Sequence, residues 1–490
     1  MKTLIFTSII SLLLWTQLAG QEISGRILDV NTGKPVAFAT IQSDQMEGVI
    51  SNDEGYFVLP LGKAASRLTI SCMGYQTKTL PLEKLNTSDA VILLDEAVVV
   101  LDEVMVSNLR PDPYQILRKV QERIPDNYDF DDRSYRLFFR ETSKADFEDL
   151  EMEVEKASHV NKEQREKTNR ELQALSSTVM ESQSKNFKDF LGNFMIHNAD
   201  SSKLEVVKAT ELLDSKKDFS MENVEERAKN IVLQYMDTTL TYTVKSGIIK
   251  IDDEMKLEVD ENEEQKGYYK TSSLKSQTRS LFNRGRFRPG SPLLELMDSK
   301  LYEFEYLKST VLEDELIHVI AFRPNRGKSK YSGKFYVNAN DYALVKTEYA
   351  FAKGKRGAKF NFKLLLGVKY VENIENGTIL YKREAHGKYR PSYILHNEGI
   401  YVYVHRPFKF IENSPDKNKV RFDFKMAGDF IERSELLISS SGPIEQGAYE
   451  QVKESEKVKF LELKKYDPTI WQDAEILQPL QEMKSFEVIE

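Results

Sequence analysis

The chain has 490 residues, of which 40% are hydrophobic and 30% are charged, and its formal net charge at pH 7 is −8. This length and apolar content are sufficient for two or three domains that each bury a core. The acidic balance gives no overall attraction to nucleic acid, so we expect no nucleic-acid partner.

Residues 1–20 have the pattern of an export signal. Lys2 supplies the positive start, residues 4–14 form a short apolar run, and the stretch that ends in Ala19 and Gly20 is small and neutral. The run is too short to span a membrane, and no later segment predicts a transmembrane helix in the mature chain. We therefore expect cleavage near Gly20 and a location in the periplasm or at the outer membrane.

The chain contains one cysteine, Cys72, which lies far from the predicted cleavage point. A lipoprotein signal needs a cysteine at that point, so we do not expect a lipoprotein. A single thiol also cannot form a disulfide within the chain. Cys72 stands in an alternating apolar segment, which is typical of a small core residue.

Residues 22–107 alternate short apolar segments with turns that are rich in Gly, Pro, Asn and Asp. Clear turns fall at 29–35 and 52–55, where those residue types supply the special backbone angles. Seven short strands at this spacing predict an all-β sandwich of the transthyretin or immunoglobulin type.

The spacing of glycines and aromatic residues in this segment resembles the carboxypeptidase-regulatory-like domain of Bacteroidota envelope proteins. The matching positions include Gly25, Thr32-Gly33, Pro35, Gly55-Tyr56-Phe57 and Gly74-Tyr75. The resemblance implies a non-catalytic accessory sandwich. The rest of the chain resembles an uncharacterised companion domain of such proteins, and this second resemblance implies no activity.

Residues 112–236 predict a mostly helical segment with one strand. Asp112 and Pro113 form a typical helix start, and Ile116, Leu117 and Val120 continue it as an apolar stripe.

The single strand of this segment is expected at 135–141. Residues 145–193 are highly charged and helix-prone, so we expect a charged helical insertion whose surface is solvated.

Residues 238–435 predict a large antiparallel β domain. The clearest strand is expected over 359–370, where apolar side chains alternate with lysines and asparagine. Asn376-Gly377 predicts a hairpin turn. Long amphipathic strands that follow helices indicate an α+β domain with a large antiparallel sheet, which could curve into a half-barrel. Residues 436–490 predict a charged, helix-prone C-terminal tail.

The sequence offers no catalytic, cofactor-binding or metal-binding motif, so we expect no catalytic residue, cofactor or metal. No histidine pair has the spacing of a zinc site. His386, His396 and His405 fall in neighbouring β segments, so they are the one set that could meet as a metal or acid–base site.

Two basic clusters are candidates for contact with anionic groups. The first cluster contains Arg279, Arg284, Arg286 and Arg288, and the second contains Lys353, Lys355 and Arg356. In an acidic exported protein, such clusters could contact lipid headgroups or lipopolysaccharide phosphates. The alternative is that both are ordinary surface loops.

We therefore expect an exported, non-enzymatic cell-envelope protein, in which an accessory sandwich precedes an α+β body that binds a ligand or partner. The ligand or partner could be a lipid, a glycan, or an outer-membrane or periplasmic protein. The alternative is a hydrolase of envelope or other polymers, with an active site assembled from residues distant in the chain. A dry apolar groove would favour carriage of a lipid, whereas two facing carboxylates in a cleft would favour catalysis.

Overall fold

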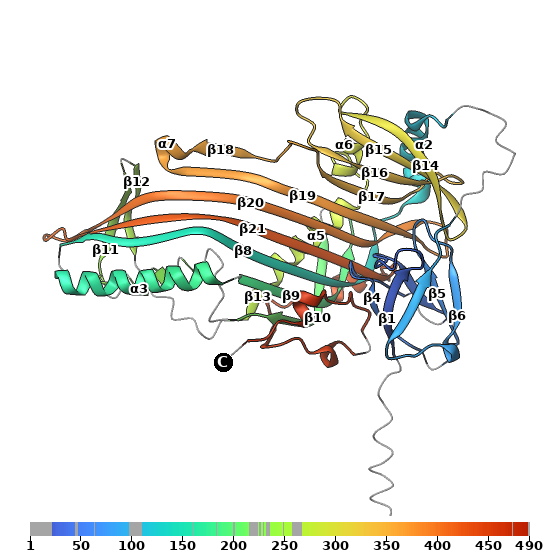
Figure 1. Cartoon of the computed structure of the whole chain (residues 1–490), viewed down its shortest axis with the longest axis horizontal. Coiled ribbons are helices and arrows are strands. Elements are labelled where there is room, and N and C mark those ends of the chain that lie inside the picture. The colour runs from blue at the N-terminus through green and yellow to red at the C-terminus, as the bar shows by residue number, and fades with distance from the viewer. Residues whose placement is uncertain are drawn as a thin grey trace, which may run out of the picture.

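The computed structural model describes residues 22–488, except 45–47, 63, 98–109, 159, 183, 199–200, 215–223, 225–226, 229, 232–235, 248, 257–266 and 473. The predicted export signal lies outside the described residues. The described chain forms a small N-terminal β domain that packs near one end of a long, curved sheet, and helices cover the opposite face of that sheet (Figure 1).

The N-terminal domain is the predicted β-sandwich. Its first sheet has the order β4-β1-β7, in which β1 and β7 are parallel, and its second has the order β3-β2-β5-β6. The strands are β1 (Glu22–Asp29), β2 (Thr40–Ser43), β3 (Val49–Ile50), β4 (Tyr56–Pro60), β5 (Arg67–Ser71), β6 (Lys78–Pro81) and β7 (Ala90–Leu94). Alternate residues of these strands, such as Ile23, Phe57 and Ile70, fill the space between the sheets. Cys72 is buried with them, and burial raises the pKa of its thiol to about 11.

The second domain is built on an open sheet of fourteen strands, whose main path runs β14-β15-β16-β17-β19-β20-β21-β8-β9-β10-β23. The first half of this path contains β14 (Tyr302–Leu312), β15 (Glu315–Pro324), β16 (Tyr331–Asn338), β17 (Leu344–Phe351), β19 (Val368–Arg383) and β20 (Tyr389–Glu412). The second half contains β21 (Lys419–Pro443), β8 (Arg133–Ala157), β9 (Ser184–Ile196), β10 (Ser202–Leu212) and β23 (Leu461–Leu463).

Three further strands lie beside this path, namely β11 (Thr241–Ser246), β12 (Ile249–Lys256) and β18 (Lys359–Phe362). β13 (Tyr268–Lys270) pairs separately with β22 (Lys457–Lys459). Neighbours on the main path are antiparallel, except for β10 and β23, which are parallel. The prediction of a large antiparallel sheet in an α+β body is confirmed.

The two faces of the long sheet have different coverings. Even-numbered residues of β20, such as Ile394 and Val402, face the helices, and we call this side the helix face. It is covered by α2 (Pro113–Asn127), α3 (Lys162–Glu181), α5 (Thr271–Arg284) and α6 (Pro292–Leu296). Odd-numbered residues such as Tyr393 lie on the opposite side, which we call the outer face. There they contact the sandwich and the tail through Trp471 and Ile476.

The helix face carries two apolar cores. α2, α5 and α6 cover the core at the end near the sandwich, and α3 covers the core of the distal half. α2 begins as predicted, because the Asp112 side chain accepts from the Tyr114 amide and Pro113 occupies the first helical position. Asn161 and Gln164 form a reciprocal cap at the start of α3.

The predicted helical character of 112–236 is wrong for most of the segment. Residues 133–157 form the single strand β8, and β9 and β10 follow, so only 162–181 of the expected charged insertion at 145–193 is helical. The charges of β8 lie on the outer face, where Glu151 and Glu155 pair with Lys425 and Arg421 of β21. A strand with one charged face and one apolar face explains the composition that suggested a solvated helix.

Two other predictions at the level of elements are corrected. The boundary at 435 is wrong, because β21 continues to Pro443. The tail at 436–490 is mainly extended or irregular, and its helices are the short α8 (Ala448–Gln451), α9 (Gln481–Lys484) and a 3₁₀ turn, Pro468–Trp471. Apolar contacts of Trp471 and Leu477 with the sheet favour this course over an independent helix.

The expected strand at 359–370 is also divided. β18 ends at Phe362, the helical turn α7 (Lys363–Leu366) follows, and β19 begins at Val368. Gly367 allows the reversal because its φ is 65°, and a β-carbon there would lie 2.1 Å from the carbonyl oxygen of His405.

Candidate functional site

Two arginines of the first predicted basic cluster, Arg284 and Arg286, form ion pairs with carboxylates of the protein itself. Arg286 is buried, and its guanidinium pairs with Asp131 at 2.5 Å. Arg284 lies 3.4 Å from both the Tyr349 hydroxyl and a Glu375 carboxylate oxygen. Of the other two members, Arg279 is half-buried on α5 and Arg288 is exposed. The four arginines therefore do not form one exposed surface.

The second predicted cluster lies on the loop that connects β17 with β18. Lys353 and Arg356 are exposed, and Lys355 donates to the carbonyl of Gly327 at 2.9 Å. The next loop residues join the sheet, because the amide of Gly357 donates to the carbonyl of Glu372. This cluster is therefore presented to solvent at the edge of the long sheet.

The three histidines do not meet. His396 lies on the helix face of β20, where it contacts the Tyr349 hydroxyl at 3.2 Å, whereas His405 lies on the outer face and contacts Asp423 at 3.1 Å. Side chains on opposite faces of one strand cannot bind the same metal ion. Within the described ranges, no group of three or more His, Cys, Asp or Glu side chains is placed to hold a metal.

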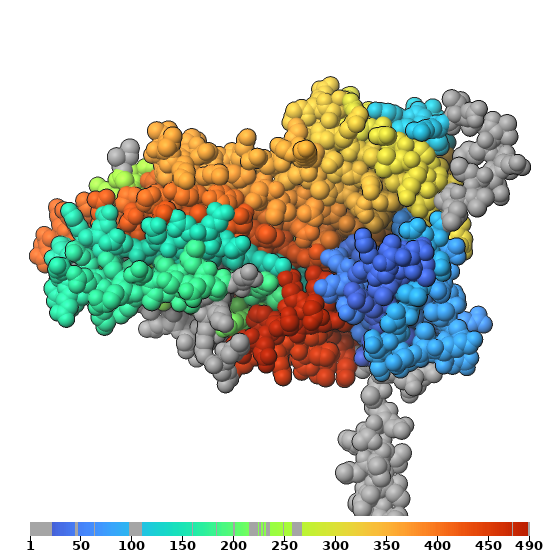
Figure 2. Space-filling view, in the orientation of Figure 1, coloured from blue at the N-terminus to red at the C-terminus, as the bar shows by residue number. Residues whose placement is uncertain are grey.

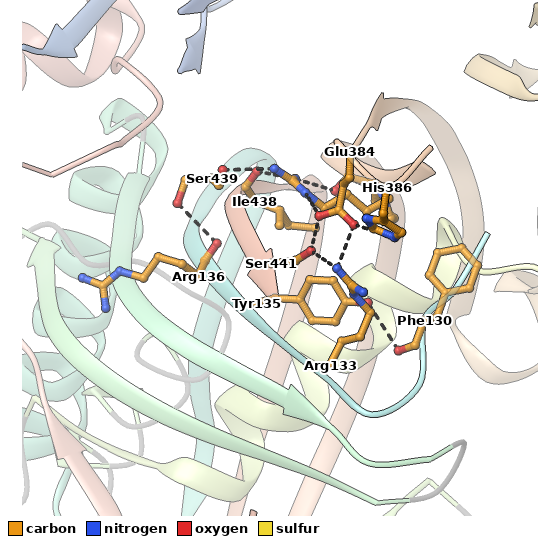
Figure 3. A network of polar contacts seen from close by, with 11 residues as sticks. Phe130, Arg133, Tyr135, Arg136, Glu384, His386, Ile438, Ser439 and Ser441 are labelled. Atoms are coloured by element: carbon orange, nitrogen blue, oxygen red, sulfur yellow. Dashed lines mark hydrogen bonds and ion pairs between the residues drawn. The ribbon is translucent and has the colours of Figure 1, made fainter. Parts of the chain in front are cut away.

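His386 belongs to a separate polar network around Glu384 (Figure 3). The Glu384 carboxylate lies 2.7 Å from Arg133 and 3.2 Å from Arg390, and it also accepts from the Ser441 hydroxyl. Arg390 is almost fully buried and donates to the carbonyls of 438 and 439. Because both arginines are held by protein acceptors, the network binds β8, β20 and β21 together.

A belt of carboxylates crosses the helix face between the two apolar cores. It contains Glu141 of β8, Glu432 of β21 and Glu398 of β20. Burial, together with the neighbouring Glu141 and Glu398, raises the pKa of Glu432 to about 7. Burial also raises the pKa of Glu141, although Lys188 lies 3.8 Å away.

Protein side chains contact the carboxylates of this belt. Gln277 of α5 donates to Glu141 at 3.3 Å, and a hydrogen bond from His396 lowers the pKa of Glu398. An inverting or retaining glycosidase needs room for a sugar between its two carboxylates. In the belt, Gln277 and Lys188 contact Glu141 and His396 contacts Glu398, while the Glu398 side chain is itself exposed.

A cavity of about 470 Å³ lies between the sandwich and the outer face of the long sheet. Phe38 and Met73 line it from the sandwich, and Lys346 and Arg383 line it from the sheet. Arg383 forms two hydrogen bonds to Glu315, at 2.8 and 3.1 Å. The cavity is therefore a junction between the two domains that is lined by both polar and apolar side chains, whereas helices cover the apolar helix face.

The most unusual surface of the described chain is the hairpin formed by β18, α7 and the start of β19, residues 359–371, which we call the distal hairpin. Leu364 is 100% exposed and Leu365 is 84% exposed, and both belong to α7. Phe360 and Phe362 are exposed on the preceding strand. Soluble proteins scatter single apolar residues over their surface, but a contiguous exposed group marks an interaction site.

The distal hairpin is held firmly although its side chains are exposed. The amide of His405 donates to the carbonyl of Gly367 at 2.7 Å, and Phe360 stacks on Tyr370. Arg406 donates to the carbonyl of Leu366 at 2.7 Å and to the carbonyl of Ser246 at 2.8 Å. The leucines are therefore displayed by an ordered turn that is fastened to two strands.

The strand next to this turn is also apolar on its surface. Ser246 ends β11 and pairs with Ile249, the first residue of β12. Ile249 and Ile251 are both exposed. Both segments lie in the half of the sheet that is remote from the sandwich, and the hairpin stands at its edge (Figures 1 and 2). The exposed apolar side chains of the two segments therefore form one region.

Sequence reasoning missed this region because Phe360, Phe362 and Leu364 fitted the alternation of a long strand. The signal that identifies the turn is the run Leu364-Leu365-Leu366-Gly367, which breaks the alternation and ends in glycine.

Comparisons with known proteins identify the first domain only. Residues 23–106 match the model of the CarboxypepD_reg-like domain, in agreement with the resemblance found in the sequence. No curated protein matches the chain.

One similar solved structure is that of a candidate membrane-associated protein of unknown function from Bacteroides fragilis NCTC 9343. It is 9% identical, the match covers 86% of this chain and 97% of that chain, and the TM-score is 0.13. So low a TM-score carries no argument about fold or function. A search of the described helices finds none with the length and apolar character needed to cross a bilayer.

Proposed function

We propose that this chain is an exported, non-enzymatic cell-envelope protein that attaches to an apolar surface of the envelope through its distal hairpin. The observation that carries the proposal is the exposure of Leu364 and Leu365 on an ordered turn. The export pattern at residues 1–20 supports a location in the envelope. The CarboxypepD_reg-like domain would then serve as an accessory module, packed near the end of the sheet opposite the attachment site.

The energetic argument for attachment is simple. Burying a leucine side chain contributes about 1.5 to 3 kcal/mol relative to leaving it in water. Leu364 and Leu365 together therefore offer about 3 to 6 kcal/mol to an apolar surface that covers them completely. A free energy of about 4 kcal/mol corresponds to a millimolar dissociation constant, so the adjacent Phe360 and Phe362 are needed for firm attachment.

The proposal that the protein is not an enzyme is supported by the ion pairs that its charged groups form with one another. The carboxylate of Glu384 is held by two arginines, and Arg383 is held by Glu315. Burial and two neighbouring carboxylates raise the pKa of Glu432 to about 7, and its carboxylate accepts a hydrogen bond from the Ser434 hydroxyl. The arrangement fits a structural body better than a hydrolase, which was the alternative.

The test is co-sedimentation of the purified mature protein with envelope membranes of the cells that produce it. The variant Leu364→Ser/Leu365→Ser should reduce the bound fraction at least tenfold, because it removes about 3 kcal/mol of apolar burial. The matched control is Val91→Ser/Leu93→Ser, which removes two exposed apolar side chains from β7 of the sandwich. Equal binding by the two variants would refute attachment through the distal hairpin, since circular dichroism can confirm that both remain folded.

A further inference from the structure

We infer that the surface which the distal hairpin meets is a phospholipid bilayer with anionic headgroups. In this arrangement Leu364 and Leu365 enter the apolar layer, and the surrounding basic residues bind headgroup phosphates. The inference rests on the proposed attachment through the hairpin and adds the chemistry of the partner.

The first argument is charge. Residues 352–371 contain six basic residues and no acidic residue, in a chain whose formal net charge is −8. The basic residues are Lys353, Lys355, Arg356, Lys359, Lys363 and Lys369. This segment is therefore a local cationic region in an acidic protein, and its charge is complementary to an anionic lipid surface.

The second argument is how apolar and basic side chains are distributed along the hairpin. Lys359 is exposed three residues before Phe362, where the Phe362–Leu366 stretch begins. Lys363 and Lys369 lie over the rings of Tyr403 and Tyr401, at 3.9 and 4.4 Å from the ring centroids. The aromatic rings hold the two ammonium groups beside the apolar turn, at the level where headgroups lie if the turn enters the bilayer. Apolar residues at the tip with basic and aromatic residues behind them are the pattern of an interfacial membrane element.

The third argument is position. The loop with Lys353 and Arg356 contacts β19 near Glu372, about six residues along the strand from the leucine turn. At about 3.3 Å per residue this separation is roughly 20 Å. Both basic groups therefore lie along one edge of the sheet, and they can face a single flat surface together.

The region beside the hairpin limits the contact. Ile249 and Ile251 of β12 extend the apolar surface, but Asp252, Asp253 and Glu254 follow them directly. Anionic headgroups would repel these carboxylates. The contact is therefore expected to include Ile249 and the leucine turn and to stop before Asp252.

The experiment measures binding of the mature protein to vesicles of phosphatidylglycerol and phosphatidylethanolamine, with phosphatidylcholine vesicles as the neutral comparison. Wild type should bind the anionic vesicles at least tenfold better, and added salt should weaken that binding. The variant Lys353→Glu/Lys359→Glu should lower the affinity for anionic vesicles at least tenfold. The control Lys34→Glu/Lys84→Glu makes the same change of net charge on exposed residues of the sandwich and should leave binding unchanged.

A second measurement reports insertion directly. In the variant Leu365→Trp, the new indole should show a blue-shifted emission on anionic vesicles, whereas Val91→Trp on the sandwich should not. Emission that stays at its value in water would overturn insertion of the turn.

The outcomes separate this inference from the proposed function. If the leucine variant loses binding to native envelope membranes but wild type does not bind anionic vesicles, attachment stands and the lipid inference is wrong. Protease treatment of the envelope membranes would then abolish binding, which would identify a protein partner. If the leucine variant binds native membranes like wild type, both proposals are wrong.

Discussion

Replacing Glu432 with glutamine should stabilise the protein at alkaline pH and leave its stability unchanged at acidic pH. Glu432 lies on the helix face of β21, where burial, Glu141 and Glu398 all disfavour its charged form. Glutamine has nearly the same shape but carries no charge, so the variant removes the cost of ionisation and keeps the packing.

The magnitude follows from the pKa. The pKa of Glu432 is raised from 4.5 to about 7 in the folded protein, so between these pH values the folded state binds more protons than the unfolded state. The stability that the neutral carboxyl contributes is complete below pH 4.5 and is lost as the pH rises towards 7. A difference of this size corresponds to about 3 kcal/mol. Glu432→Gln should therefore be more stable than wild type by about 2 to 3 kcal/mol at pH 8.

The assay is urea denaturation of mature wild type and variant at pH 4.5, 6 and 8, followed by the fluorescence of Trp471. The gain should be near zero at pH 4.5, intermediate at pH 6 and complete at pH 8. Glu122→Gln, on the exposed face of α2, is the control for loss of a carboxylate elsewhere. If Glu432→Gln raised the free energy of unfolding equally at all three pH values, the ionisation of Glu432 would not be the cause of the gain.

Two further predictions concern how the domains are held. Asp189→Asn should lower the free energy of unfolding by about 3 to 5 kcal/mol, because it removes the counter-charge of the Arg140 guanidinium, which is 3% exposed and lies 2.6 Å from Asp189 in the wild type. Chemical denaturation of Asp189→Asn and of the double variant Arg140→Met/Asp189→Leu measures this loss. A double variant as unstable as the single one would contradict the ionic explanation. Asn52→Ala should weaken the docking of the sandwich on the tail by about 1 to 2 kcal/mol, because the Asn52 amide donates to the carbonyls of Gln478 and Pro479. Limited proteolysis should then cleave the junction faster than in wild type. An unchanged rate of cleavage would contradict the role given to these hydrogen bonds.

The parts of the fold that the sequence predicts correctly are those determined by nearby residues. The sandwich strands and the start of α2 depend on turns and caps within a few residues, such as Gly33, Gly55 and Asp112. The long strand β8 depends instead on partners far along the chain. Glu151 pairs with Lys425, and the sequence gives no indication of that distant partner. The same charges therefore suggested a solvated helix.

The residues of the candidate site also differ in whether nearby sequence or distant partners determine their positions. Lys353 and Arg356 are exposed because their loop of glycine and basic residues has no apolar face to bury, and their contact with anionic groups stays a prediction. Arg286 was not recognised as internal, because its partner Asp131 lies 155 residues earlier. Leu364 was assigned to the apolar face of a strand, because apolar residues are usually buried, whereas the structure exposes it on a turn.

The hydrogen bonds between Asn52 and the tail impose an order on assembly. They join residues separated by 426 and 427 positions in the chain. The sandwich has its own core and can fold early. Its docking against the sheet, however, requires contacts with β21 and with the segment around Gln478. The N-terminal domain is synthesised first, so it cannot take its final position on the sheet until residues 471–479 have also been made. Docking of the two domains therefore depends on contacts that are distant in sequence, and such contacts form slowly.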